Sequence, residues 1–225
     1  MTTTVFLLRH ATTASTGKRL GGRTEAPLDD AGRAQAHAAA RHLTAVPFRA
    51  VYSSPLPRTM ETASILAEPH RLDVTPTEGL IEVEYGRWTD RTLAQVSRNR
   101  LWPVIQSRPS LVAFPDGETI RQAQLRAVDA VEELVARHKG RVIAAVSHAD
   151  VIKAVVSFYL GQPLDLFQRI VIEPASSTVL QLAPGGRPAL LRLNDTGPWD
   201  PERLRARRPP KTGPASTKPR SGSRG

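Results

Sequence analysis

The sequence predicts an α/β protein, a three-layer α/β/α fold with a largely parallel central sheet and helices on both faces. Short apolar runs of strand length alternate along the chain with segments of helical period. Three polar clusters follow expected strands, at Arg9-His10, at 53–58 and at Ser147-His148. Because ligands of such sheets bind outside the carboxyl ends of the strands, these clusters predict one composite site.

Local signals justify the individual elements. Residues 5–8 and 142–146 are apolar runs typical of buried strands. Asp29 and Asp30 are placed to cap an alanine-rich helix, and Gly140 is placed to end a long one. In chain order we expect a strand over 5–8, a helix over 31–38, a strand over 50–52, a helix over 57–66, a strand end and loop over 79–88, a helix over about 120–138, a strand over 142–146, a helix over 151–160, and late strands over 170–172, 178–182 and 190–193.

Composition narrows the class of protein. The 225 residues contain no cysteine, which excludes disulfides, zinc–thiolate sites, iron–sulfur clusters and cysteine nucleophiles. The N-terminus lacks the basic start of a signal peptide, and Arg9 and His10 interrupt its apolar run. No apolar run approaches the ~20 residues of a membrane span. We therefore expect a soluble cytoplasmic protein with no membrane partner, no metal site and no cofactor.

The net charge of +10 is unevenly distributed. The last 28 residues carry +6 of it, from eight lysines and arginines against two acids, and they also hold six prolines. Such a composition buries too little apolar surface to offset the loss of chain entropy on folding. We expect residues 1–197 to form the folded domain and 198–225 to form a disordered, basic, proline-rich tail.

Five side chains at the expected sheet edge suit phosphoryl transfer without a metal. That reaction needs a nucleophile, cationic donors for the phosphate oxygens and an acid for the leaving alkoxide. A neutral imidazole can attack, the planar fork of arginine can hold phosphate oxygens, and a carboxyl group with a raised pKa can protonate the leaving group. The five are Arg9, His10, Arg58, Glu82 and His148. Chemistry alone does not choose Glu82 over Glu78 or Glu84.

Six segments, in order over about residues 5–150, resemble motifs of the histidine phosphatase, or phosphoglycerate-mutase-like, superfamily (branch 1). The six are Leu8-Arg9-His10-Ala11-Thr12-Thr13, Ala26 to Ala36, Ser53 to Ala63, Glu82 to Trp88, Pro115 to Glu118, and Ser147-His148-Ala149. The first motif alone would be a weak signal, but all six in order are a strong one. The stretches 148–153 and 166–170 also resemble an actinobacterial subgroup of phosphomutases and phosphatases.

The resemblance implies a phosphoglycerate-mutase-like fold and a role for each of the five residues. His10 would be phosphorylated, while Arg9, Arg58 and His148 would hold the transferring phosphate. Glu82, which the spacing of the family's E-x-x-x-G-x-W motif selects, would protonate the leaving oxygen and later activate water. The implied activity is metal-independent hydrolysis of a small phosphorylated metabolite.

The sequence departs from the family's motifs in four places. Ala11 and Ala149 replace the usual glycines after the two histidines, and Thr12 replaces a frequent Glu or Gln. Thr16 falls near the family's usual phosphate-contacting asparagine, so it is a candidate substrate contact. None of these changes removes a catalytic group, but each bears on substrate size and on the phosphate contacts.

Alternatives remain open at this point. A phosphoglycerate-type mutase is the first, but the segment over 89–114 is short and lacks the basic insertion of the glycolytic mutases, which favours hydrolysis. The second is a nucleic-acid- or partner-binding protein that uses the basic tail and has a decayed catalytic domain; decay should have removed at least one of the five residues. Contact of the tail with nucleic acid would be non-specific. A homodimer is left open.

A chain ending at Gly197 tests the division into domain and tail. We expect it to fold and to keep its turnover of small phosphate esters, because the tail supplies almost no apolar side chains. It should lose most of its salt-dependent affinity for nucleic acid, since that attraction scales with the phosphates neutralised. Loss of turnover at an unchanged folded fraction, measured by circular dichroism, would contradict the division.

Overall fold

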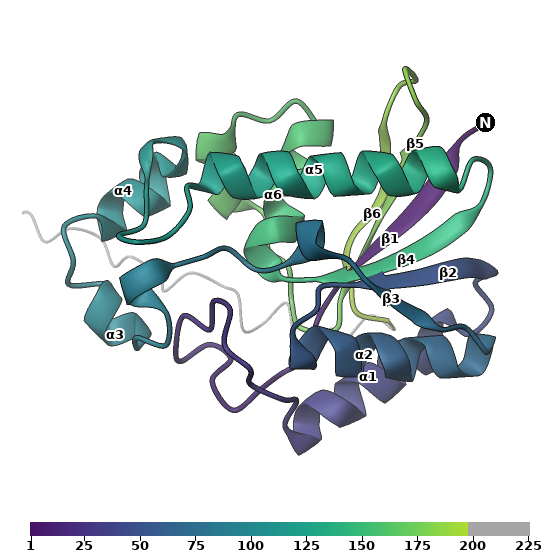
Figure 1. The fold of residues 1–225 in the computed structure, drawn as a ribbon, viewed down its shortest axis with the longest axis horizontal. Coiled ribbons are helices and arrows are strands. Elements are labelled where there is room, and N and C mark those ends of the chain that lie inside the picture. The colour runs from purple at the N-terminus through teal and green to yellow at the C-terminus, as the bar shows by residue number, and fades with distance from the viewer. Residues whose placement is uncertain (198–225) are drawn as a thin grey trace, which may run out of the picture.

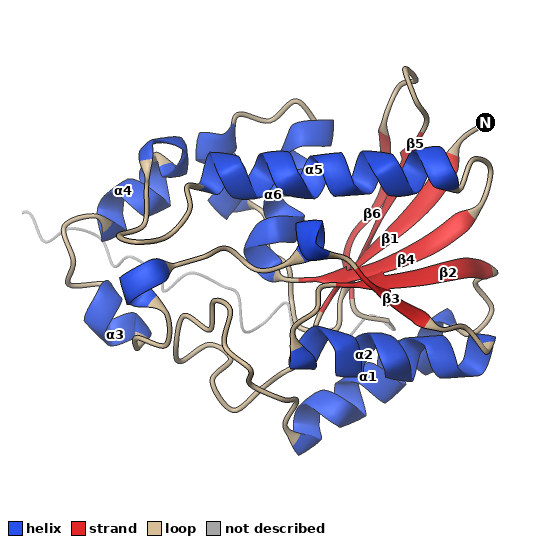
Figure 2. Cartoon of the chain, in the orientation of Figure 1, coloured by secondary structure: helices blue, strands red, loops and turns tan. Residues whose placement is uncertain are grey.

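The computed structural model describes residues 1–197, so the expected tail over 198–225 lies outside the described residues. Within them, six strands form one sheet in the order β3-β2-β4-β1-β5-β6 (Figures 1 and 2). The strands are β1 (Thr3–Arg9), β2 (Phe48–Ser53), β3 (Val74–Pro76), β4 (Val142–Ser147), β5 (Ser177–Leu182) and β6 (Ala189–Asp195). The four strands from β3 to β1 pair in parallel, and β5 and β6 pair antiparallel at the other edge. The largely parallel sheet expected from the sequence is therefore confirmed.

Helices cover both faces of the sheet and complete the three layers. α1 (Asp30–Leu43) and α2 (Pro57–Ala67) pack together on one face, and α5 (Ile120–Arg137) and α6 (Ala149–Tyr159) pack together on the other (Figure 1). The short helices α3 (Leu93–Val96) and α4 (Trp102–Ser107) lie beyond the end of α5, away from the sheet (Figure 1). None of the helices in residues 1–197 has the length and apolarity that crossing a bilayer requires.

Two predicted helix starts can be compared with the structure. Asp29 is the N-cap of α1, and its Oδ1 accepts a hydrogen bond of 2.7 Å from the backbone N–H of Gly32. α1 continues to Leu43, five residues past its expected end. α5 begins with a capping box between Thr119 and Gln122, as expected after the turn over 115–118.

The structure corrects three sequence-based expectations. Residues 170–172 are not a strand: Ile170 and Ile172 are buried in the core and Val171 is exposed, which imitates strand alternation without a neighbouring strand to pair with. Residues 79–88 hold 3₁₀ turns rather than a strand end, over Glu78–Leu80 and Gly86–Trp88. The short edge strand β3 was missed because its three residues carry little apolar signal.

Backbone packing between two loops fixes the segment that carries Glu82. The carbonyl of Pro115 accepts a 2.9 Å bond from the N–H of Arg87, and the N–H of Glu118 donates a 2.9 Å bond to the carbonyl of Glu84. Gly86 has φ +52°, and a Cβ there would run into the Pro115 carbonyl and the backbone of Asp116. Only glycine fits this close approach and this backbone conformation together.

Gly86→Ala should therefore destabilise the protein by about 3 kcal/mol, because it adds overpacking to left-handed strain. Gly185→Ala is the matched control, since Gly185 has φ +63° with no atom near a built Cβ. That change should cost only about 1 kcal/mol. Urea unfolding of the two variants measures the difference, and equal losses of unfolding free energy would contradict the packing argument.

Candidate active site

The carboxyl edge of the parallel strands gathers four of the five predicted residues. His10 directly follows β1, and His148 directly follows β4. These two strands pair with Arg9 opposite Ser147, so the two imidazoles lie side by side with ring centroids 5.2 Å apart. Arg58 is the second residue of α2, which begins four residues after β2 ends, and its guanidinium reaches His148.

His10 is buried and held in one tautomer. Its Nδ1 lies 2.7 Å from the backbone carbonyl of Ala11. A carbonyl only accepts, so Nδ1 carries the proton and Nε2 presents a lone pair. Burial, followed by the charges of Arg58 and Arg9, lowers the pKa of His10 to about 3. The neutral imidazole that nucleophilic attack requires is therefore the resting form near neutral pH.

His148 is fully buried and held by two partners. Nη2 of Arg58 lies 3.3 Å from Nδ1, and because a guanidinium only donates, Nδ1 accepts. Nε2 then donates to the hydroxyl of Ser54 at 2.8 Å. Burial, followed by Arg58, lowers the pKa of His148 well below its ordinary value. This second imidazole is also neutral.

Two arginines supply fixed positive charge next to the imidazoles. Arg58 is nearly inaccessible and donates to the carbonyls of Thr24 and Gly22 at 2.8 and 2.6 Å. Arg9 donates through Nη1 to the carbonyl of Ile172 at 2.7 Å. Its buried Nε has no hydrogen-bond partner among the described residues. An unpaired buried donor beside His10 is suited to an oxygen of a bound anion.

Glu82 joins the cluster from the 3₁₀-rich segment, and its neighbour Glu84 does not. Glu82 is buried, and its Oε2 lies 3.8 Å from Nδ1 of His148. Burial, followed by the charge of Asp150, raises the pKa of Glu82 to about 7. The side chain of Glu84 is 33% exposed and faces Arg23 instead. The structure thus places Glu82, and not Glu84, beside His148.

Three residues that the sequence analysis did not single out hold the Glu82 segment in place. Arg126 of α5 donates to the carbonyls of Gly79, Ile81 and Glu82 at 2.7 to 3.1 Å. Glu118 pairs with Arg126 at 2.7 Å, and Arg23 donates to the Glu82 carbonyl at 3.2 Å. The Pro115 to Glu118 motif was a signal for this cluster, although no role followed from it.

The atypical residues of the first motif take local roles. The Oγ1 of Thr16 accepts from the N–H of Thr13 at 2.9 Å, so it closes the loop after β1, and its contact with substrate stays a prediction. The methyl group of Ala11 packs with Leu28 and Ala36. Among residues 1–197 no group of three or more His, Cys, Asp or Glu side chains is arranged to hold a metal ion.

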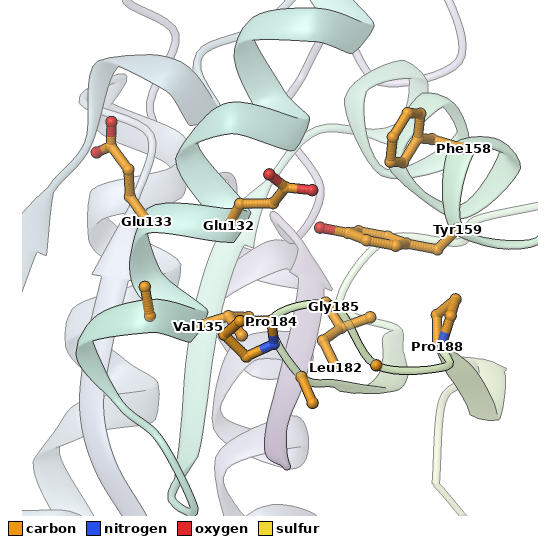
Figure 3. Close-up of a pocket in the computed structure, with 12 residues that line it drawn as sticks. Glu132, Glu133, Val135, Phe158, Tyr159, Leu182, Pro184, Gly185 and Pro188 are labelled. Atoms are coloured by element: carbon orange, nitrogen blue, oxygen red, sulfur yellow. The ribbon is translucent and has the colours of Figure 1, made fainter. Parts of the chain in front are cut away.

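A separate cavity of about 620 Å³ lies elsewhere in the fold and is lined by other residues. It opens between α5, the end of α6 and the β5–β6 hairpin, and Figure 3 shows the rings of Phe158 and Tyr159 and the carboxylate of Glu132 at its wall. None of the five predicted site residues lines it. We therefore assign the chemistry to the carboxyl edge of the sheet.

Comparison with known proteins gives a consistent set of relatives. The profile of the histidine phosphatase superfamily (branch 1) matches residues 5–196. Phosphoserine phosphatase 1 of Hydrogenobacter thermophilus is 29% identical over 198 residues, which cover 85% of this chain and 92% of that protein. An acid phosphatase of Mycobacterium tuberculosis is 32% identical over 180 residues, covering 76% of this chain and 83% of that one. The structure of a mycobacterial glucosyl-3-phosphoglycerate phosphatase superposes with a TM-score of 0.79 at 27% identity, covering 87% of this chain and all of the other.

The protonation state of His10 can be measured directly. Its ¹⁵N signals, assigned by their loss in His10→Gln, should show a neutral ring protonated at Nδ1 and should not titrate between pH 8 and pH 5. The reason is that burial, Arg58 and Arg9 hold its pKa at about 3. A protonation midpoint above pH 5 in the ligand-free protein would contradict the burial and charge argument.

Proposed function

Because the chain belongs to branch 1 of the histidine phosphatase superfamily, we propose that it is a metal-independent phosphomonoester hydrolase that works through a phosphohistidine at His10. Membership and the phosphatases among its relatives support a hydrolase. The observation that carries the proposal is the state of His10. This imidazole is neutral, its Nδ1 is bonded to a carbonyl, and its Nε2 lone pair lies in the field of the Arg58 and Arg9 guanidiniums.

In the first step the Nε2 of His10 attacks phosphorus, and the bond from phosphorus to the leaving oxygen breaks. Arg9, Arg58 and His148 would hold the equatorial oxygens, where charge stays high through the transfer. Glu82 gives its proton to the leaving oxygen, so the alcohol departs neutral. A carboxyl group with a pKa of about 7 suits this role, since a substantial fraction of it is still protonated near neutral pH and it is acidic enough to donate.

In the second step water attacks the phosphohistidine. The Glu82 carboxylate left by the first step takes a proton from that water, and the bond from phosphorus to Nε2 breaks. Inorganic phosphate leaves, and His10 and Glu82 return to their starting protonation states. One carboxyl group thus serves as acid and then as base, and no proton remains unaccounted for.

The proposed substrate is a small phosphorylated metabolite. Two of the relatives are named for phosphoserine and for glucosyl-3-phosphoglycerate, both of which are phosphate esters of small molecules. The segment over 89–114 contains the two short helices α3 and α4. It is the proposed determinant of which phosphate ester the protein accepts. Its shortness also favours release of phosphate to water over the return of phosphate in a mutase reaction.

The intermediate is the direct test. Brief exposure to a ³²P-labelled phosphomonoester should give an acid-labile, base-stable protein phosphate, because phosphorus bonded to an imidazole nitrogen has that lability. His10→Ala should abolish the label and reduce turnover by at least about 10⁴-fold, since nucleophile and intermediate are both lost.

His42→Ala is the matched control, because His42 is an exposed histidine on α1, and its label and turnover should equal those of the unaltered protein. Label that persists in His10→Ala would overturn the proposed nucleophile. Treatment with a chelator should leave labelling intact, and a loss that a divalent ion restores would point to a different mechanism.

A further inference from the structure

We infer that Asp150 is a positioning residue of the reaction, whose carboxylate, held by Tyr85 and Lys153, keeps the proton on Glu82. The inference rests on the proposed function and adds to it a reason why Glu82, rather than its carboxyl neighbour, is the acid. Asp150 lies in the first turn of α6, two residues after His148.

Both oxygens of Asp150 receive a hydrogen bond from a side chain. The hydroxyl of Tyr85 donates to Oδ2 at 2.9 Å, and Nζ of Lys153 donates to Oδ1 at 3.1 Å. Lys153 is itself held, since it donates to Oε1 of Gln168 at 3.1 Å and lies 5.6 Å from the ring centroid of Phe167. The ionised form of Asp150 is therefore stabilised at each oxygen, once by a neutral donor and once by a cation.

Glu82 has a poorer set of donors. Its Oε1 accepts a single 2.9 Å bond, from the backbone N–H of Val83. His148, the nearest side-chain nitrogen at 3.8 Å, presents its unprotonated Nδ1 and so offers no proton. Hydrogen bonding therefore does little to stabilise the ionised form of Glu82, which receives one bond from a neutral donor.

Charged groups from several elements surround Glu82, and two of them, Arg126 of α5 and Arg23, donate to its backbone carbonyl. Arg9 at the end of β1 and Arg58 on α2 favour its ionised form, while Asp150 on α6 opposes it. Tyr85 and His148 also face the group, and both are neutral. Burial and Asp150 together outweigh the two arginines, and the pKa of Glu82 rises to about 7.

Of the two carboxyl groups, the one with the better hydrogen-bond donors ionises first as the pH rises. Neighbouring carboxyl groups resist ionising together, so the better-solvated one keeps the charge. Burial raises the pKa of Asp150, but Lys153 and Tyr85 overcome it, and the net pKa lies below the usual value. Asp150 therefore takes the charge and Glu82 takes the proton, the separation of roles expected of a general acid beside a fixed anion.

Asp150 also ties two active-site segments together. Tyr85 lies three residues after Glu82, and Asp150 lies two residues after His148, so the 2.9 Å bond between them spans the two segments. Both Tyr85 and Asp150 are thereby fixed relative to the acid they influence. A positioning role needs this rigidity, because the effect of a charge on a neighbour falls with distance.

The test is the pH dependence of the single-turnover phosphorylation of His10 by an alkyl phosphate. Glu82→Gln first identifies the high-pH limb that belongs to Glu82, since that variant should lack it. Asp150→Asn keeps the shape and removes the charge, so we expect this limb to move to lower pH by about one unit. The rate above the limb should then fall by about tenfold, while nitrophenyl phosphate, whose leaving group needs little protonation, should react at nearly the original rate.

Three further variants separate charge from shape. Asp150→Glu keeps the charge and should leave the limb in place, whatever it does to the absolute rate. Asp129→Asn, an exposed acid on α5, is the matched control and should not move it. Asp150→Ser also removes the charge and should move the limb in the same direction as Asp150→Asn, which keeps the test available if Asp150→Asn does not fold.

Two outcomes would overturn the inference: a limb that stays in place in both Asp150→Asn and Asp150→Ser, or one that moves as far in Asp150→Glu as in Asp150→Asn. Failure of the proposed function looks different. In that case His10 would not be labelled in the unaltered protein, or Glu82→Gln would retain the high-pH limb.

Discussion

The end of β4 fixes the positions of the other parts of the site, because the neighbouring segments pair with it or form hydrogen bonds to it. Its parallel pairing with β1 runs to Arg9 opposite Ser147, which sets the two histidines after the strands side by side. The N–H of Ser54, at the end of β2, donates to the carbonyl of Val146 at 2.9 Å, and the hydroxyl of Ser147 donates to the carbonyl of Leu80 at 2.7 Å. A slip of one residue in this register would turn side chains to the opposite face of the sheet and separate the groups.

Burial and neighbouring charges then set the protonation states of the side chains that this geometry brings together. Burial, followed by the charges of Arg58 and Arg9, keeps His10 and His148 neutral, because a third and fourth positive charge in the same low-dielectric space would be costly. The same guanidiniums would ionise Glu82 if they acted alone, and burial together with Asp150 opposes them. Each group is thus held in its form by a neighbour whose own charge is fixed by further contacts.

The sequence alone predicted the layers, the four longer helices and five candidate residues that the structure brings close together, because each carries a local pattern: an apolar run, a helical period, a capping residue or a motif. It did not find Arg126, whose role depends on where α5 crosses the Glu82 segment, a long-range contact without a local signature. It placed a strand over 170–172 because Ile170, Val171 and Ile172 form an apolar, β-branched run, which favours strand. The link between Tyr85 and Asp150 was also out of reach, since 65 residues separate them along the chain.

The unpaired Nε of Arg9 has a consequence for what happens after the chemistry. Among the described residues this buried donor has no partner, and leaving such a group unsatisfied costs about 1–3 kcal/mol. Any tetrahedral oxyanion that enters relieves that cost, and inorganic phosphate carries the same oxygens as the ester from which it came. We therefore expect inorganic phosphate, the product of the proposed reaction, to compete with the ester for this donor, so that free phosphate slows turnover.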